Sequence, residues 1–256
     1  MIKQIVKVGN SAGVVLPKSW YGGRVKIELI EKPLDIKKDV LKILEPYLND
    51  IQGVYLTGSY ARREQEKDSD VDIIAISEKI RKKITSGKYK IEIYPMKNIK
   101  ETLKKHPIMF YPAFYESKTI INNALLQKLI NINLTKKDFK LFYKESKRVY
   151  KMDKELIELD KLDGKYLQSY TIVYSSVLRL RALFMIKSIL SKRNYSKWSF
   201  EKWILNETKI SKQDFEKIYQ IYKYVRDSKL IKEKIDINVV ERVMDFLKKE
   251  VDKYDK

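Results

Sequence analysis

The sequence predicts an α+β protein made of a small N-terminal β module, an α/β core with a mixed sheet, and a C-terminal helical bundle. Three observations lead to this fold class. Short alternating segments fill the beginning of the chain, strand and helix patterns alternate after them, and the last part has almost wholly helical spacing of its apolar residues. The expected domains are residues 1–33, 34–118 and 119–256.

The composition narrows the class of protein. The net charge is +20, which favours a polyanionic partner such as nucleic acid or a nucleotide. The absence of cysteine excludes disulfide bonds and thiolate metal sites, and the single histidine, His106, excludes any site that needs two from one chain.

The most apolar long stretch, residues 170–190, is expected to be a buried helix of a cytoplasmic protein that does not enter the membrane. Arg179 and Arg181 lie at its centre. Each charge there would cost about 2.5 kcal/mol or more in lipid. No apolar N-terminal signal is visible either.

The first segment, residues 1–33, is too short to bury a core of its own. It must therefore pack on the rest of the chain or pair with a copy of itself. Its expected elements are a strand, a turn, a short strand, a second turn and a last strand, at residues 2–8, 9–13, 14–17, 18–24 and 25–30.

The pattern of this segment resembles the AbrB/MazE group of swapped-hairpin DNA-binding modules. The matching residues are Gly9, Asn10, Ser11, Leu16 and Pro17. In that group two chains build one barrel, so the resemblance implies a homodimer through residues 1–33. Lys and Arg outnumber the acids here, which suits phosphate contact. A dimerisation module with no role in DNA binding is the alternative.

The core begins with a helix predicted over 36–48, whose apolar positions fall on one face. We then expect a strand, a short helix and two further strands, the last of which ends at a proline, over residues 53–57, 59–66, 71–77 and 88–95.

Helices of the bundle are predicted over residues 119–131, 135–159, 166–192, 198–206, 211–228 and 236–253. Several of them carry basic residues interleaved with Tyr and Trp, a combination that can stack bases and hold phosphates. The more ordinary interpretation is a solvated helix face. Arg179 and Arg181 are expected to pair with acids inside the bundle; contact with a nucleotide or an acceptor is the alternative.

The stretch "GSYARREQEKDSDVDIIA", residues 58–75, carries the chemistry. Side chains alternate along a strand, so Asp70 and Asp72 point to the same side. Two adjacent carboxylates stay ionised at low cost only when they are well solvated or a cation lies between them, and oxygen ligands alone suit Mg²⁺. Gly58 and Ser59 open a helix and suit phosphate binding. Glu92, on the next predicted strand, could complete a metal site or accept a proton.

At these residues the chain resembles the DNA polymerase beta-type nucleotidyltransferase superfamily, in particular its minimal members. The residues that match at the family spacing are Gly58, Ser59, Ala61, Arg62, Ser69, Asp70 and Asp72. The resemblance implies that Asp70, Asp72 and Glu92 hold Mg²⁺. It also implies an NTP, expected to be ATP, bound by Gly58, Ser59, Arg62, Arg63 and Ser69. A hydroxyl of RNA, a protein or a small molecule would attack the α-phosphate and release pyrophosphate.

One residue departs from the family pattern. Arg63 stands where the family has Gly, and it either binds phosphate or crowds the turn. An alternative function is therefore a DNA-binding dimeric regulator with an inactive or nucleotide-sensing core. A third is an antitoxin-like partner that nucleotidylates a toxin. The helical half resembles HEPN-like bundles, but no His follows Arg179 and Arg181, so an RNase of that type is not expected.

Overall fold

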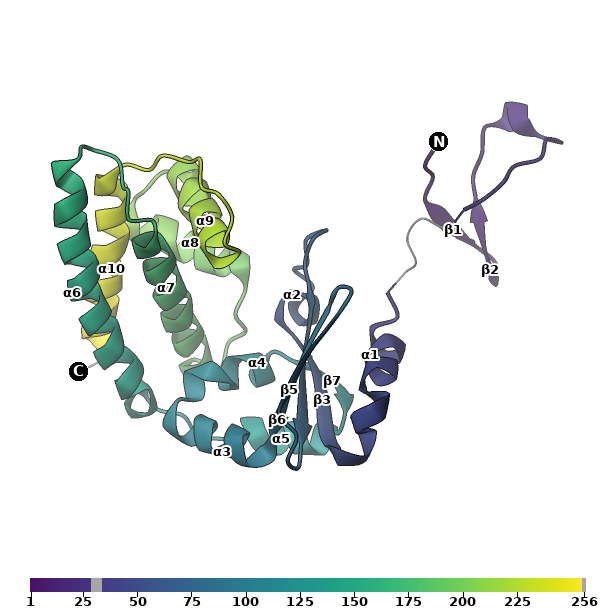
Figure 1. Cartoon of the computed structure of the whole chain (residues 1–256), viewed down its shortest axis with the longest axis horizontal. Helices are drawn as coiled ribbons and strands as arrows, with labels where there is room; N and C mark the ends of the chain where they lie inside the picture. Colours follow the sequence, from purple (N-terminus) through teal and green to yellow (C-terminus); the bar gives the residue numbers. More distant parts are fainter. Residues whose placement is uncertain (29–33, 255–256) are drawn as a thin grey trace. The chain divides into compact units, whose positions relative to one another are not determined.

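The computed structural model describes residues 1–28 and 34–254, and the chain divides into two compact units, Met1–Asp35 and Ile36–Lys256. The predicted α+β class is confirmed, with a small N-terminal strand pair, a five-stranded mixed sheet and C-terminal helices (Figure 1). Among the described residues, no helix is both long enough and apolar enough to cross a membrane.

The described residues of the N-terminal unit form one antiparallel hairpin, β1 (Ile5–Val8) with β2 (Ser11–Val14). Gly9 takes a φ of +57°, which glycine adopts without steric cost, so two residues suffice for the turn. The strand predicted over 14–17 is wrong except at Val14, because the chain pairs already from Ser11 and residues 15–17 have no regular structure. A short 3₁₀ helix, η1 (Lys18–Trp20), follows.

The strand predicted over 25–30 is not formed within its described part. Residues 25–28 have no regular structure, and residues 29–30 lie outside the described range. A strand needs an edge to pair with, and Ile27 remains 64% exposed instead. Among residues 1–28 none is buried.

The sheet of the second unit has the order β5-β6-β4-β3-β7, and only β4 and β6 run parallel. Its strands are β3 (Ile51–Thr57), β4 (Val71–Ser77), β5 (Lys82–Ser86), β6 (Tyr89–Pro95) and β7 (Lys118–Ile121). The predictions for β4 and, within a residue or two, for β3 and β6 are confirmed. The two short edge strands, β5 and β7, were not predicted.

The prediction of a helix over 119–131 is wrong for its first residues. Residues 118–121 pair with β3 instead, and α5 (Asn123–Ile130) begins only after Asn122. The Asn122 side chain accepts the N–H of Leu125 at 3.0 Å and so caps the helix at that point.

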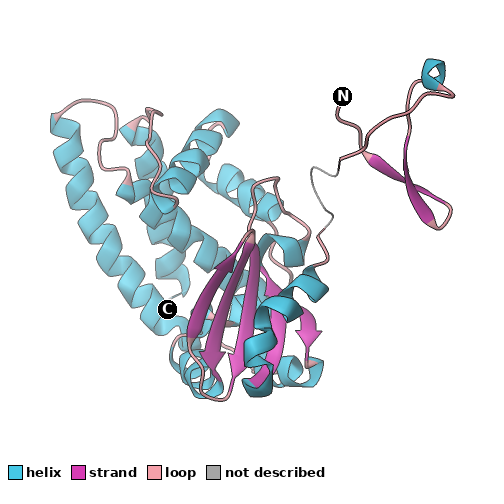
Figure 2. Ribbon diagram, turned by 45° about the vertical axis from the view of Figure 1, so that its right-hand side comes forward, coloured by secondary structure: helices cyan, strands magenta, loops and turns pink. Residues whose placement is uncertain are grey.

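Each face of the sheet is covered by different helices (Figure 2). On one face, α1 (Ile36–Leu44) and α2 (Gly58–Arg62) pack on the inward side chains of β4, including Val71 and Ile73. On the other face, α3 (Met96–Lys105), α4 (Tyr111–Tyr115) and α5 pack around Ile76. The helix predicted over 36–48 ends at Leu44 and continues as a 3₁₀ helix, η2 (Glu45–Asp50).

Five long helices build the bundle: α6 (Lys140–Leu162), α7 (Thr171–Leu190), α8 (Lys197–Thr208), α9 (Lys212–Arg226) and α10 (Ile237–Tyr254). As predicted for residues 170–190, α7 is the buried helix, and its apolar side chains form the centre of the largest core. Ile189 near its end belongs to the same apolar cluster as Ile76 of the sheet, and this shared cluster joins the bundle to the core.

Candidate active site

The Gly-Ser turn lies directly against Asp72. Thr57 ends β3, and its Oγ1 donates a hydrogen bond of 3.2 Å to the backbone oxygen of Asp72. Gly58 has a φ of +67°, and a Cβ built on it would lie 2.6 Å from Oδ2 of Asp72. Both the backbone conformation and the close approach therefore require glycine. Ser59 follows at the start of α2.

Asp70 and Asp72 lie side by side at the beginning of β4. Val71 and Ile73 are buried under α1 and α2, so the alternation of the strand puts the two carboxylates on the opposite face. Both are only partly exposed. Burial, and next the negative charge of Asp70, raise the pKa of Asp72. The chain thus brings together two like charges, as the sequence predicted.

A lysine that sequence reasoning missed compensates one of these charges. The parallel register sets Lys90 of β6 opposite Asp72, and its Nζ lies 2.5 Å from Oδ2 of Asp70. This hydrogen bond to Asp70 raises the pKa of Lys90, and the charges of Asp72 and Asp227 add to the effect. The alternation of β6 predicts that Lys90 and Glu92 share a face, but only the strand register brings Lys90 to the aspartates.

Glu92 lies two residues after Lys90 on β6, where the register sets it opposite Ile74. Its carboxylate accepts a hydrogen bond from the Tyr94 hydroxyl and pairs with Nζ of Lys83 at 2.9 Å. Burial alone would raise the pKa of Glu92, but these two hydrogen bonds outweigh it and lower the pKa. Within the described part of the chain, no three acidic or histidine side chains gather into a metal-binding cluster.

Asp70 and Asp72 nevertheless suit a divalent cation. They offer only carboxylate oxygens, they repel each other, and one of them already attracts an ammonium group. The glycine at position 58 lets the carboxylate of Asp72 lie directly against the backbone, where a Cβ would collide with it. The participation of Glu92 stays a prediction.

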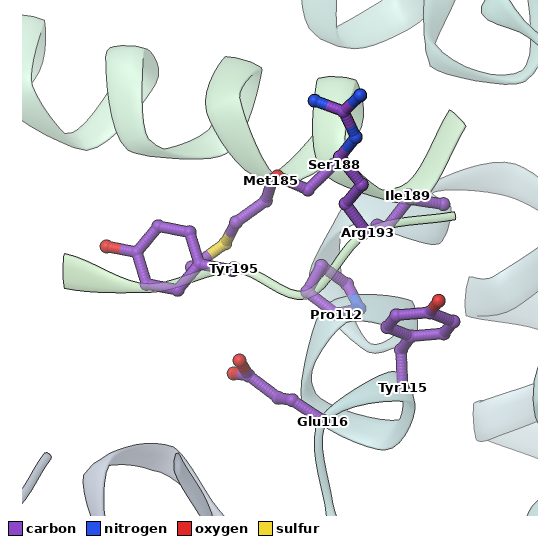
Figure 3. Close-up of a pocket in the computed structure, with 8 residues that line it drawn as sticks. All are labelled: Pro112, Tyr115, Glu116, Met185, Ser188, Ile189, Arg193 and Tyr195. Atoms are coloured by element: carbon purple, nitrogen blue, oxygen red, sulfur yellow. The ribbon is translucent and has the colours of Figure 1, made fainter. Parts of the chain in front are cut away.

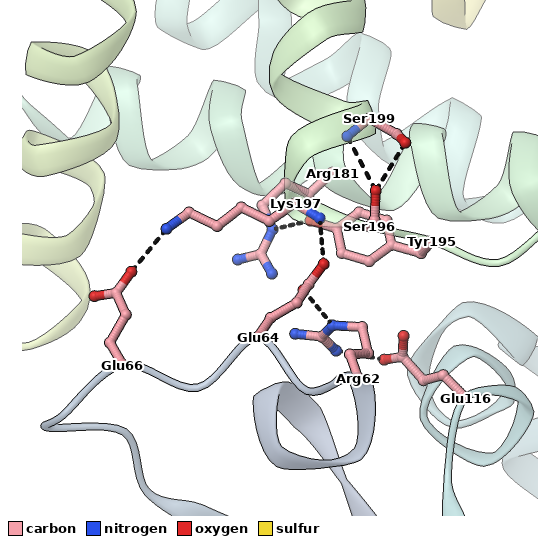
Figure 4. Close-up of polar contacts among 9 residues, drawn as sticks. All are labelled: Arg62, Glu64, Glu66, Glu116, Arg181, Tyr195, Ser196, Lys197 and Ser199. Carbon is pink, nitrogen blue, oxygen red and sulfur yellow. Dashed lines mark hydrogen bonds and ion pairs between the residues drawn. The ribbon is translucent and has the colours of Figure 1, made fainter.

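Arg62, a predicted nucleotide contact, is held by two carboxylates (Figure 4). Its Nε donates to Glu64 at 2.9 Å, and one terminal nitrogen donates to Glu116 at 2.7 Å. The guanidinium also lies 5.4 Å from the centre of the Tyr195 ring. Burial raises the pKa of Glu116 even though Arg62 opposes the rise, so this carboxylate depends on its partner. Nothing in the local sequence pattern indicated Glu116.

The loop after α2 is tied to the bundle by the next two acids. Glu64 accepts the backbone N–H of Lys197 at 2.9 Å. Glu66 pairs with Nζ of Lys197 at 2.7 Å and of Lys223 at 3.1 Å, as Figure 4 shows for Lys197. The hydrogen bonds from these two lysines lower the pKa of Glu66 to about 2.

The two arginines of α7 do not behave alike. Arg181 donates to the hydroxyls of Tyr222 and Tyr195, at 2.8 and 3.4 Å, and so the prediction that it pairs with an acid is wrong. Tyrosine hydroxyls accept hydrogen bonds inside the bundle without adding a second buried charge. Arg179 donates to Ser175, which in turn donates to Asp153. Burial lowers the pKa of Arg179, and the negative charge of Asp153 offsets only part of that fall.

Arg63 and Ser69 lie at the two ends of the loop. Arg63 has φ 61° and ψ 36°, a left-handed conformation that ends α2 and cuts short the helix predicted over 59–66. Its side chain is exposed. Ser69 accepts the N–H of Glu66 at 2.8 Å, so it shapes the turn that leads to Asp70.

A small pocket lies beside Glu116, between α4, α7 and the segment that follows α7 (Figure 3). Its space of about 10 Å³ has room for one water molecule and not for a nucleotide. A larger cavity of about 210 Å³ lies between α6 and α10, and none of the predicted site residues lines it.

Comparison with known proteins gives one match to a family model and several matches to solved structures. The family model described as nucleotidyltransferase domain matches residues 36–249. No curated protein sequence matches the chain. The two solved structures described next are distant, so the family assignment depends on the sequence match.

The first solved structure is a nucleotidyltransferase-like protein from Exiguobacterium sibiricum 255-15, with 12% identity and a TM-score of 0.35 over 85% of this chain and 75% of that one. The second is spectinomycin adenyltransferase AAD(9) from Enterococcus faecialis, solved with ATP and spectinomycin. It has 18% identity and a TM-score of 0.43 over 84% of this chain and 97% of that one.

Proposed function

The chain belongs to the nucleotidyltransferase domain family, and on that premise we propose that it transfers a nucleoside monophosphate from an NTP to a hydroxyl acceptor. The acceptor oxygen forms a bond to the α-phosphorus, the bond from that phosphorus to the bridging oxygen breaks, and pyrophosphate leaves. The observation that supports this most strongly is the pair Asp70 and Asp72, side by side against the Gly58 turn.

Asp70 and Asp72 are the residues that would hold Mg²⁺. The ion, when bound, neutralises charge on the transferring phosphoryl group and activates the acceptor hydroxyl. The chain itself orients these ligands, since the Thr57 hydroxyl holds the backbone oxygen of Asp72. Gly58 and Ser59, at the start of α2, stay the predicted phosphate contacts, because glycine permits a close approach of the backbone and the serine hydroxyl can donate a hydrogen bond.

Glu92 is the proposed third carboxylate, either as a ligand or as the group that takes the proton from the acceptor hydroxyl. Its lowered pKa keeps it ionised and able to accept that proton. To reach the acceptor it would exchange its contact with Lys83, an exposed side chain that is easily displaced.

The remaining predicted contacts divide into two kinds. Arg62 is engaged by Glu64 and Glu116, and we assign it the task of holding α2 and its Gly-Ser turn in place. Arg63 is exposed next to that turn and stays a predicted phosphate contact, as does Ser69. ATP as the preferred nucleotide also stays a prediction.

The acceptor class is RNA, a protein side chain or a small hydroxylated molecule. The net charge of +20 favours an acceptor that is itself polyanionic.

The test is to incubate the full chain with each α-labelled NTP, Mg²⁺, and in turn total RNA, cell extract or small hydroxylated acceptors. Label should reach one acceptor class and should disappear with Asp70→Asn and Asp72→Asn together. Asp68→Asn, which changes an exposed acid of the same loop, is the matched control and should keep transfer. Transfer that survives the double substitution contradicts the mechanism.

A second candidate function is DNA binding by a dimer, and the exposure of the N-terminal unit supports the dimer. None of the described residues of the N-terminal unit is buried, and Ile5, Val8 and Ile27 are 45%, 58% and 64% exposed. Apolar strands left open in this way require a covering partner. We propose that a second copy of residues 1–33 provides it and pairs with residues 25–28, which form no strand in the single chain.

Light scattering on the full chain and on a chain without residues 1–33 tests this assembly. A dimer that becomes a monomer on deletion is expected, with loss of DNA binding and retention of transfer to small acceptors. A full chain that remains monomeric at high micromolar concentration contradicts it.

A further inference from the structure

The ammonium group of Lys90 lies beside the two proposed metal ligands, and the family motif does not account for it. Its Nζ is 2.5 Å from Oδ2 of Asp70. The neighbours Tyr89 and Ile91 are buried, so Lys90 projects from the face of the sheet that also carries Asp72. A central strand therefore holds this cation at the carboxylates, not a flexible loop.

Stability does not explain the pair. The side chains of Lys90 and Asp70 are 48% and 42% exposed, and solvent screens ion pairs of that exposure. The location of the pair is its unusual feature. Two carboxylates lie together there, and a positive charge reduces the repulsion between them. A divalent cation would satisfy the same need and would compete for the same oxygen of Asp70.

We propose that Lys90 is a tethered counter-ion, which neutralises Asp70 until a metal–nucleotide complex displaces it. This role rests on the proposed function, since it takes Asp70 and Asp72 as the residues that would hold the metal. A bare metal ion must displace the ammonium without giving it another partner. A metal ion that arrives with a triphosphate supplies phosphate oxygens to which the released ammonium binds. Lys90 thereby couples metal binding to nucleotide binding.

The coupling can be measured without turnover by titrating the full chain with Mn²⁺ and following the free ion by electron paramagnetic resonance. Titrations are made with and without a non-hydrolysable NTP analogue. Lys90→Gln should bind Mn²⁺ alone about tenfold more tightly than the native chain, because a unit positive charge next to the site is gone. The analogue should tighten Mn²⁺ binding less in this variant than in the native chain.

Lys79→Gln is the matched control. Its ammonium pairs with exposed Glu78 at 3.9 Å, at the opposite end of β4, so it should titrate like the native chain. One outcome overturns only the role of Lys90. In it, Lys90→Gln and the native chain bind Mn²⁺ equally well, while Asp70→Asn with Asp72→Asn still weakens binding. If the double aspartate variant binds Mn²⁺ as well as the native chain, the metal site of the proposed function fails, and the role of Lys90 fails with it.

Discussion

Residues 62–66 and residues 70–72 lie at the two ends of the connection from α2 to β4. Their carboxylates nevertheless have opposite electrostatic surroundings. Glu64 and Glu66 are both matched by cations from the same unit, and the pKa of Glu66 falls to about 2. Asp72 is partly buried next to another acid, and its pKa rises. The comparison shows which charges maintain the architecture and which are available for a ligand.

The same contrast separates the basic residues. Arg62 is enclosed between Glu64 and Glu116 and under Tyr195, so its charge is used by the protein itself. Lys90 and Arg63 are exposed, and Lys90 meets Asp70 at a solvent-accessible ion pair. The position of a residue in the motif therefore does not by itself show that the residue contacts substrate.

The largest expected effect comes from Arg62→Met. It leaves the carboxylate of Glu116, whose side chain is 12% exposed, without its partner, and the free energy of unfolding should fall by about 3 kcal/mol. Urea unfolding measures it, with Arg63→Met as the matched control, which should change the value by less than about 0.5 kcal/mol. Adding Glu116→Gln to Arg62→Met should recover part of the loss. No loss for Arg62→Met would show that the arginine is free to bind substrate.

A smaller effect is expected from Arg63→Gly, which restores the family residue at this position. Arg63 has a φ of 61°, a conformation that costs a residue with a Cβ about 1–2 kcal/mol. Part of this gain is lost because glycine is more flexible when unfolded, so stability should rise by up to about 1 kcal/mol.

The same variant separates the two roles considered for Arg63. If the side chain only crowds the turn, transfer is unchanged or improves. If it contacts phosphate, the KM for the NTP rises while the fold becomes more stable. A fall in both stability and transfer would contradict both roles.

Sequence reasoning placed Gly58 and the two aspartates together but did not find Glu116 or Lys90, for physical reasons. The spacing from Gly58 to Asp72 and the alternation of β4 are local, and local patterns survive folding. Glu116 and Lys90 meet the motif only through strand register and helix packing, from 54 and 20 positions away from their partners Arg62 and Asp70. The edge strands β5 and β7 were missed because they are short and carry too little apolar alternation to be told from loop or helix.

The smallest expected effect concerns Glu66→Gln and its dependence on pH. The folded-state pKa of Glu66 is lowered from 4.5 to about 2, so its stabilising contribution is present above pH 4.5 and is lost as the pH falls towards 2. The side chain is 56% exposed, and solvent screening limits the contribution to less than about 1 kcal/mol.

The contribution of Glu66 to stability is measured by unfolding the native chain and Glu66→Gln at several pH values. The difference between them should be constant from pH 7 to 5 and should shrink below pH 4.5. A difference that grows in acid would contradict the assignment of Lys197 and Lys223 as its partners.

Asp72→Asn tests the contrast between structural and ligand-binding carboxylates most directly. The raised pKa of Asp72 means that ionisation costs stability in the folded chain, a cost that appears as the pH rises above the ordinary value of 3.8. At pH 7 the variant should therefore be as stable as the native chain or up to about 1 kcal/mol more stable. Its transfer of α-labelled nucleotide should fall by at least about a hundredfold. A variant that unfolds more easily and still transfers label would contradict the account.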